Sequence, residues 1–419
     1  MKSNYFETIP KHWKLTKFGD VAKITCGVAA TPEYVDSSVG IPFLSARNVQ
    51  NERLSLNFFQ YIPLELHRKL TKNTKPEKGD VLLTRVGAGI GEAALIDIDF
   101  EFSVYVSLTL IKCKKELHSN FAKLLLNTNY YRYLATRDQF AGGGVQNLNV
   151  QMVKEYPIPT PPIPEQKKIA QILSTWDKAI DTSEKLLANS RQQKKALMQQ
   201  LLTGKKRLRD KNGVRFSGEW KLKKLSEICD LNPRKADEPS DGLVSFIAMD
   251  SVSEDAKIKR QEERKYIDVS KGFTSFIDHD VIVAKITPCF ENGKGAYAEG
   301  LKNSVGFGST EFHILRAKQG ISSKYIYYIT NTSEFRIRGE ANMQGSAGQK
   351  RVTTDYLKGL KLSLPSSPEE QQKIAATLSS ADREIETLQQ KLDCLKQEKK
   401  ALMQQLLTGK RRVQVEEAQ

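Results

Sequence analysis

Several turns of the N-terminal half carry side chains that could read the edges of nucleic-acid bases. Arginine, asparagine and glutamine can form paired hydrogen bonds to base edges, and loops on a rigid scaffold are where such residues usually lie. The candidates lie in the stretches SARNVQ, TRVGAGIGE and GGGVQNLN, and they are Arg47, Asn48, Arg85, Gln146, Asn147 and Asn149. Each of them, taken alone, could equally be an ordinary solvated polar group.

The C-terminal half carries a second set of such side chains at analogous positions. They are Lys285, Thr287, Asn292, Lys294, Gln349, Lys350 and Arg351. Lysine adds contacts to phosphates as well as to bases. The two sets are not identical in chemistry.

Residue patterns that would support catalysis or metal binding are not found in the sequence. Gly87, Gly89 and Gly91 follow a β-rich run, but their spacing is GxGxG and not the dinucleotide-binding GxGxxG. The five histidines form no ligand-spaced cluster with cysteine or acidic residues. Asp278 and Asp280 in DHD could bind a metal, yet the corresponding stretch of the first half reads KGD. We therefore predict no catalytic residue and no metal site, and a chain that is not itself an enzyme.

The composition favours a polyanionic partner. The 419 residues carry a formal net charge of +16 and a pI of about 9.4, and lysine or arginine near phosphates releases condensed counterions. The five cysteines are scattered without a CxxC pair, which is typical of a reducing compartment. No signal peptide and no apolar run of about 18 residues is present. A cytoplasmic location and no membrane partner are expected.

The elements that would position these turns occur twice. The stretch ALMQQLLTGKKR at residues 196–207 recurs as ALMQQLLTGKRR at 401–412, an offset of 205 residues. EQKKIA at 165–170 recurs as EQQKIA at 370–375 with the same offset. WKLTKFGDV at 13–21 is matched by WKLKKLSEI at 220–228. A period this long indicates two homologous units and not a solenoid.

Each unit is expected to be a globular domain, a Pro-rich hinge and a long helix. The predicted boundaries are residues 1–160 and 210–363 for the domains, 161–209 and 364–412 for the helices, and 413–419 for a tail. β-rich runs at 81–86, 102–113, 281–286 and 311–317 and helical stretches at 121–137 and 324–340 predict mixed α/β domains. The prolines of 156–164 should end the first domain, because proline cannot continue a helix or donate to a ladder. The fold class is therefore α+β with an internal repeat.

Steps of four and three residues trace one narrow apolar seam along each helix, which is the coiled-coil pattern. The seam residues are Ile169, Leu173, Trp176, Ile180, Leu187, Leu197 and Leu201 in the first helix and Ile374, Leu378, Ile385, Leu388, Leu392, Leu395, Leu402 and Leu406 in the second. Each helix of about 39 residues would be about 58 Å long. Lys194 and Lys399 occupy the same seam level, so parallel pairing would place two ammonium groups face to face. We predict an antiparallel pair.

This arrangement resembles the specificity subunit of type I restriction-modification systems. The resemblance rests on PPIPEQKKIAQIL, on the twin ALMQQLLTGK helix ends and on the tandem of domain plus helix, and it covers nearly the whole chain. The second unit departs from it with PSSPEEQQKIAATL. The resemblance implies two target recognition domains on an antiparallel helical spacer, each reading one half of a split sequence in double-stranded DNA.

The resemblance also implies partners. Two methyltransferase subunits would bind the spacer and carry S-adenosylmethionine, and restriction subunits would carry ATP and magnesium, so this chain would hold no cofactor. The loops GGGVQN and GSAGQK differ, which implies an asymmetric target. A spacer near 58 Å could hold the half-sites one to one and a half turns apart, at about 34–36 Å per turn.

Two other functions remain open from sequence. One is a self-contained DNA methyltransferase or nuclease, and the other is a coiled-coil scaffold that reads no sequence. Methyl transfer by the isolated chain would favour the first, and equal affinity for scrambled duplexes at a stated salt concentration would favour the second.

Overall fold

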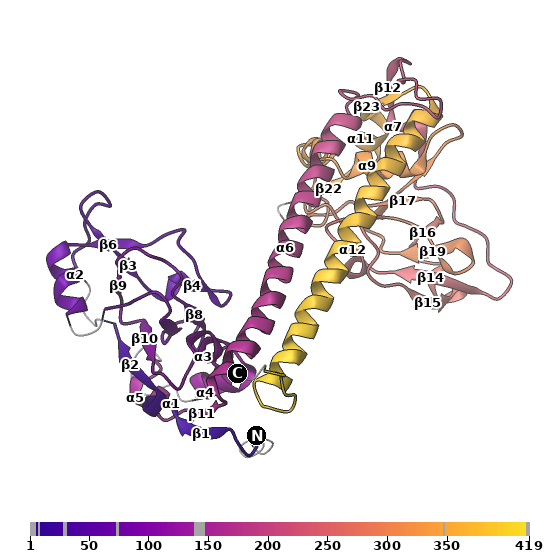
Figure 1. Cartoon of the computed structure of the whole chain (residues 1–419). Coiled ribbons are helices and arrows are strands. Elements are labelled where there is room, and N and C mark those ends of the chain that lie inside the picture. The colour runs from indigo at the N-terminus through magenta and orange to yellow at the C-terminus, as the bar shows by residue number, and fades with distance from the viewer. Residues whose placement is uncertain are drawn as a thin grey trace. The chain divides into compact units, whose positions relative to one another are not determined.

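The computed structural model describes residues 6, 9–27, 32–72, 75–137, 147–346 and 348–415 (Figure 1). The chain forms two compact units. Unit 1 consists of Met1–Glu184 with Lys391–Gln419, and unit 2 consists of Lys185–Gln390. Each unit therefore combines one globular domain with one half of each long helix.

The centre of unit 1 is an antiparallel four-stranded sheet in the order β2-β10-β7-β8. Its strands are β2 (Ala22–Cys26), β10 (Leu108–Cys113), β7 (Val81–Thr84) and β8 (Ala93–Leu95). Successive residues of a strand point to opposite faces, and here both faces are covered. Val81 and Leu83 pack in a core with Phe121 of α3 (Ser119–Leu126), whereas Leu82 packs in another core with Leu44.

The remaining strands of unit 1 form smaller sheets around this centre. β3 (Ile41–Leu44) pairs in parallel with β9 (Ser103–Val104) and antiparallel with β6 (Gln60–Ile62). β4 (Val49–Gln50) and β5 (Arg53–Leu54) form a hairpin, and β1 (Lys14–Lys17) pairs with β11 (Pro157–Thr160). The short helices are α1 (Phe18–Val21), η1 (Ala46–Asn48), α2 (Leu64–Thr71), α4 (Asn129–Arg137) and α5 (Val150–Lys154).

Unit 2 repeats this topology. Its four-stranded sheet has the order β13-β20-β17-β18 and is built from β13 (Cys229–Leu231), β20 (Phe312–Ala317), β17 (Val281–Ala284) and β18 (Gly295–Tyr297). The parallel pair recurs as β14 (Leu243–Ile247) with β19 (Val305–Gly308), flanked by β15 (Glu262–Lys265) and β16 (Thr274–Ile277). β12 (Trp220–Lys224) pairs with β23 (Lys361–Pro365), and β21 (Met343–Gln344) pairs with β22 (Arg351–Val352). The helices are α7 (Leu225–Ile228), η2 (Met249–Ser251), α8 (Tyr266–Val269), η3 (Lys302–Ser304), α9 (Ser323–Thr330), α10 (Ser333–Glu340) and α11 (Thr354–Gly359).

The two long helices are α6 (Ile163–Leu201) and α12 (Pro368–Leu406), each of 39 residues. In unit 1 the Lys399 Nζ lies 2.6 Å from Asp177 Oδ1, and in unit 2 the Lys194 Nζ lies 2.5 Å from Asp382 Oδ1. In each contact a residue near the beginning of one helix meets a residue near the end of the other, so the two helices are antiparallel. The prediction of two homologous mixed units with an antiparallel helix pair is confirmed.

The apolar seam is buried over most of its length. Nine of its residues are less than a tenth exposed: Ile169, Leu173, Ile180, Leu187, Leu201, Ile374, Leu378, Leu392 and Leu406. The other six are partly exposed: Trp176, Leu197, Ile385, Leu388, Leu395 and Leu402. No helix among the described residues is long and apolar enough to cross a membrane.

Several local expectations differ from the structure. The prolines of 156–164 are expected to prevent strand pairing, but Pro157 and Pro159 lie in β11. They are tolerated there because β11 belongs to a two-stranded sheet and pairs on one side only, with β1. Pro164 and Pro368 lie in the first turns of α6 and α12, where the missing N–H has no intrahelical partner to lose. The stretch 102–113 holds two strands, and the stretches 121–137 and 324–340 each hold two helices, which are separated at residues 127–128 and 331–332.

Candidate nucleic-acid interface and helix joints

In unit 1 the structure brings Arg85 and Asn147 together. Arg85 follows β7, and its Nε donates to the Leu148 carbonyl at 2.9 Å while a terminal nitrogen donates to Asn147 Oδ1 at 3.3 Å. Val86 forms an isolated bridge with Asn147. We call this contact between the end of β7 and residues 147–148 the strand-end joint of unit 1. It leaves the side-chain amide nitrogen of Asn147 without a hydrogen bond to any described residue. Asn149 is exposed and its Oδ1 accepts from Gln151 N at 2.9 Å, which caps α5.

Arg47 lies at the same joint but Asn48 does not face solvent. Ser107 accepts from Ala46 N through Oγ and from Arg85 N through its carbonyl, so η1 and Arg85 share one anchor. Arg47 is exposed. Asn48 is 2% exposed, and its side chain accepts from Ser45 N and donates to the carbonyls of Ser55 and Phe58. The base-reading role predicted for Asn48 is corrected, because its hydrogen-bonding groups hold the loop together.

Gln146 lies outside the described residues, so the structure says nothing of its predicted role.

Unit 2 has the same joint with different side chains. Lys285 follows β17, its N donates to the Glu311 carbonyl, and its carbonyl accepts from Val352 N. Ile286 bridges Arg351, as Val86 bridges Asn147. The Arg351 guanidinium binds the Glu311 carboxylate through Nε at 3.0 Å and a terminal nitrogen at 2.9 Å. Arg351 thereby holds the pKa of Glu311 below its usual range.

The exposed part of this joint is the segment before Arg351. Gln349 and Lys350 are exposed, and the Lys350 carbonyl accepts from Thr287 N at 2.9 Å. The Thr287 hydroxyl donates to Glu291. Asn292 and Lys294 lie on the following turn, where their side chains donate to Glu254 and to the Met249 carbonyl. The structure thus groups Lys285, Thr287, Gln349, Lys350 and Arg351, and it directs Asn292 and Lys294 elsewhere.

A buried histidine supports this joint in unit 2. The His313 Nε2 donates to the Val352 carbonyl at 2.7 Å, and Asn232 faces Nδ1 at 3.4 Å. His313 is 2% exposed. Its burial lowers its pKa, and Lys285 lowers it further, against opposing effects of the Val352 carbonyl and Glu311.

The residues that join each domain to the helices were not identified from sequence. In unit 1 the β4–β5 hairpin presents Arg53, which lies 2.5 Å from Asp181 of α6. In unit 2 Lys257 lies 3.9 Å from Glu386 of α12. Lys123 of α3 lies beside the first contact and is 8% exposed, and burial lowers its pKa. The 205-residue offset between Asp181 and Glu386 is the signal that could have found this joint.

The repeated stretches EQ(K/Q)KIA and LLTGK(K/R)R contact each other. In unit 1 the buried Glu165 accepts from Arg412 Nε at 2.6 Å and from Trp13 Nε1 at 3.1 Å. In unit 2 the buried Glu370 accepts from Arg207 Nε at 2.5 Å and from its terminal nitrogen at 2.7 Å. The beginning of each helix is thereby tied to the residues that follow the other helix.

The glutamine after each of these glutamates ties the helix to its own domain. Gln166 accepts from His118 N at 2.8 Å and donates to the Pro161 carbonyl. Gln371 accepts from Ser322 N at 3.0 Å and donates to the Pro365 carbonyl. The repeated Glu-Gln pair therefore connects the beginning of one long helix, the residues that follow the other long helix, and the globular domain of the same unit.

The described residues contain no cluster of three or more histidine, cysteine or acidic side chains that could hold a metal ion. Asp280 of the DHD stretch is 1% exposed and is bound by Arg316 at 2.8 and 2.7 Å. Its carboxylate is thus committed to an ion pair within the domain.

Comparison with known proteins gives one family. The sequence profile described as "Type I restriction modification DNA specificity domain" matches residues 10–189 and again 217–397. The two matches follow the repeat and together cover most of the chain.

Individual relatives agree with this match. The "Type I restriction enzyme EcoAI specificity subunit" of Escherichia coli is 37% identical over 154 residues, or 36% of this chain, and the match spans only 26% of that protein. The "Type I restriction enzyme MjaVIII specificity subunit" of Methanocaldococcus jannaschii is 24% identical over 97% of this chain and 94% of its own length. A crystal structure of a type I restriction-modification S subunit from M. genitalium has the same fold, with a TM-score of 0.58, 14% identity, and coverage of 97% of this chain and 98% of that one.

Proposed function

Because the chain belongs to the family of type I restriction-modification DNA specificity domains, we propose that it is a non-catalytic subunit that reads a bipartite, asymmetric DNA target. Each unit would read one half of the target. The relatives that match along their length are named specificity subunits, and the basic net charge of +16 suits a polyanionic partner.

The observation that carries this proposal is the pair of equivalent joints with different chemistry. Arg85 with Asn147 in unit 1 corresponds to Lys285 with Arg351 in unit 2, on the same strand ends and with the same backbone bonds. Both joints hold an arginine that is bound within its own domain, so the difference lies in Asn147 of unit 1 against Lys285 of unit 2. An asparagine amide favours adenine, whereas lysine favours guanine or phosphate. The scaffold repeats but the side chains differ, which supports two unlike half-sites.

The partners in this proposal are two methyltransferase subunits and further restriction subunits. The helix pair supports it, since the nearly identical stretches 196–207 and 401–412 would offer two similar surfaces to two copies of one partner. S-adenosylmethionine, ATP and magnesium would be held by those partners.

Methylation mapping of whole genomes tests the proposal. Deleting this gene should remove methylation at one split motif whose two halves differ, and restoring the gene should bring it back. Loss of a single uninterrupted motif, or no change in the methylated sequences, would contradict the proposal that each unit reads one half of a split target.

A further inference from the structure

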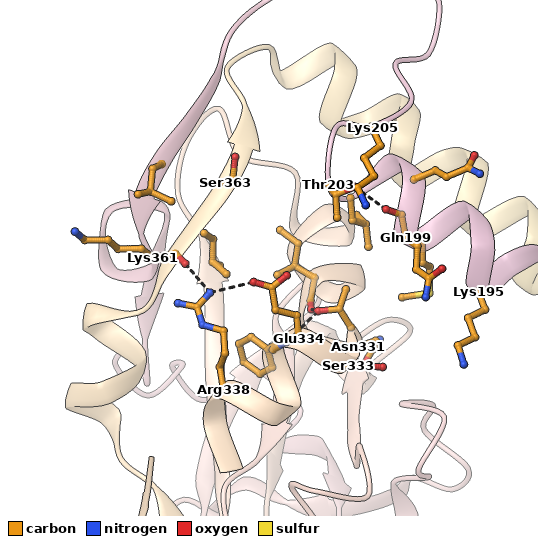
Figure 2. A pocket seen from close by; sticks show the side chains of 18 residues that line it. Lys195, Gln199, Thr203, Lys205, Asn331, Ser333, Glu334, Arg338, Lys361 and Ser363 are labelled. Atoms are coloured by element: carbon orange, nitrogen blue, oxygen red, sulfur yellow. Dashed lines mark hydrogen bonds and ion pairs between the residues drawn. The ribbon is translucent and has the colours of Figure 1, made fainter. Parts of the chain in front are cut away.

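Unit 2 contains a hollow of about 790 Å³ where the end of α6 meets the domain (Figure 2). α6 and the turn after it supply one wall, which includes Met198, Leu202 and Lys205. α10 and the β12–β23 ribbon supply the opposite wall. The hollow lies wholly within unit 2.

Large apolar side chains form the floor of this hollow. Leu202, Ile329 and Phe335 are buried beneath it. At its edge Leu222 of β12 is 65% exposed, which is far more than a leucine in a packed strand. A single exposed leucine is ordinary, but a concave site with an apolar floor and a few polar groups at its rim is typical of a ligand-binding surface.

The rim of the hollow is basic. Lys195, Lys205 and Lys361 are exposed, and none of them forms an ion pair within the described residues. Glu334 is the acidic side chain of the lining, and it is paired with Arg338 at 3.3 Å. Figure 2 shows Arg338 bound to Glu334 and to the Lys361 carbonyl, with Lys195 and Lys205 projecting from the opposite wall. The uncompensated charge of the rim is therefore positive.

The equivalent surface of unit 1 is covered in part by the chain itself, although Leu15, the counterpart of Leu222, stays 52% exposed. Phe6 packs edge-to-face on Tyr130, which corresponds to Glu334, with ring centroids 5.2 Å apart. Pro10 lies so close to Gly409 that a Cβ there would be 2.3 Å from its ring. Thr408, next to Gly409, is 4% exposed, whereas its counterpart Thr203 is exposed.

We propose that the hollow of unit 2 binds an extended acidic peptide segment of another protein through one large apolar side chain. The apolar side chain contacts the floor and the neighbouring Leu222, in the way that Phe6 packs on Tyr130 and Pro10 on Gly409 in unit 1. Acidic residues on either side of it pair with Lys195, Lys205 and Lys361. A nucleic-acid occupant would use the lysines but would leave Leu222 and the apolar floor unused, so the peptide fits the surface better.

Peptide selection on the full-length chain tests this proposal. A random dodecapeptide library is panned on the immobilised protein, with counter-selection on the Leu222→Asp variant. We expect enriched peptides with one aromatic residue or leucine flanked by aspartate and glutamate. Labelled synthetic copies should bind about tenfold more weakly to Leu222→Asp, measured by fluorescence anisotropy. Lys205→Glu should also weaken binding, and more so at low salt.

Leu15→Asp is the matched control, because Leu15 occupies the same place in β1 of unit 1 and is 52% exposed. It should leave peptide binding unchanged. Circular dichroism checks that each variant is folded, and Lys361→Glu gives a second rim variant. Enrichment of basic peptides, or peptides that bind Leu222→Asp as well as wild type, overturns the proposal. So does a loss of duplex DNA binding in Lys205→Glu that is not seen in Leu222→Asp, or a concentration-dependent dimer abolished by Leu222→Asp. Genome methylation tests the proposed function separately.

Discussion

At the residue scale, the two buried glutamates that begin the long helices differ in how they are neutralised. Glu370 is 1% exposed and its partner Arg207 is 20% exposed in its side chain. Glu165 is equally buried, but Arg412 is 49% exposed and Trp13 supplies another donor. Removing one member of a buried ion pair leaves an uncompensated charge, whereas exposed pairs contribute little. The two joints are therefore equivalent in position and unequal in strength.

Arg207→Met should lower the free energy of unfolding by about 3 kcal/mol, and Arg412→Met by about 1 kcal/mol. Glu165 keeps the hydrogen bond from Trp13 in the second variant, whereas Glu370 loses the only side-chain donor that it has among the described residues. Urea unfolding followed by tryptophan fluorescence measures both variants. Trp220 lies 5.9 Å from the Arg207 guanidinium in unit 2, and Trp13 donates to Glu165, the partner of Arg412, in unit 1. Equal losses in the two variants would contradict the assigned difference in burial.

His313 gives unit 2 a dependence on pH. Its folded pKa lies below the ordinary 6.5, so the unfolded chain takes up a proton first as the pH falls. The stability is complete above about pH 6.5 and is lost below it at up to 1.4 kcal/mol per pH unit, roughly, until the folded form is also protonated. Unfolding between pH 7.5 and 5.5 should show this loss in wild type and a smaller one in His313→Gln. His279→Gln, at an exposed position, is the control and should retain the wild-type slope.

At the element scale, the antiparallel helix pair depends on ions as well as on its apolar seam. Lys194 pairs with Asp382 in unit 2 and Lys399 with Asp177 in unit 1, so each seam lysine meets an aspartate of the other helix. The position of these lysines opposes a parallel pairing and directly supports the observed one. The spacing of the seam and the position of two lysines were thus enough to predict the orientation.

Exchanging the charges tests that pairing. Lys194→Asp or Asp382→Lys alone should destabilise the protein by about 1–2 kcal/mol, because like charges then face each other at partly buried positions. The double exchange should recover most of that loss. The more exposed pair of Lys396 with Glu184, half-exposed on both sides, is the control and should show a coupling below about 0.5 kcal/mol. No recovery in the double variant would argue against this contact.

The contents of the turns were less predictable than the helices. Arg47 and Asn48 are neighbours on one turn, yet η1 exposes the first and buries the second against the carbonyls of Ser55 and Phe58. Glu311 was not among the predicted site residues, because those were chosen as basic or amide side chains. In the structure its carboxylate binds and holds the Arg351 guanidinium. Periodicity reports which face of a long element is buried, but it carries no such information for three-residue turns. Contacts between distant segments, such as Arg53 with Asp181, need the fold itself.

At the scale of the whole molecule, the two units share their scaffold but differ in the side chains at the strand ends. The Glu-Gln joints, the helix pair and the sheet order recur in both units, whereas the strand-end joints carry different side chains. Specificity would then be exchangeable one unit at a time. Gln349 and Lys350 are the exposed members of the joint in unit 2 and are best placed to show this.

Gln349→Ala with Lys350→Ala should weaken methylation of targets through one half-site only. We expect a loss of about tenfold or more for the wild-type target and relaxed preference at bases of that half, with the other half unchanged. Methylation of duplexes altered in either half by the assembled complex measures this. Lys358→Ala, on α11 away from the joint, is the control. Equal loss of preference in both halves would mean that the loop contacts only the DNA backbone.

The division of the helices between the units also sets an order of events during synthesis. Unit 2 is continuous in sequence and complete once residue 390 has emerged. Unit 1 begins first but needs the last part of the chain, since Glu165 meets Arg412 across 247 residues. At about 5–20 residues per second the ribosome needs roughly 12–50 s to cover that distance. The first half of the protein to be made is therefore the last to be finished, and until then its share of α6 lacks the α12 residues that cover it.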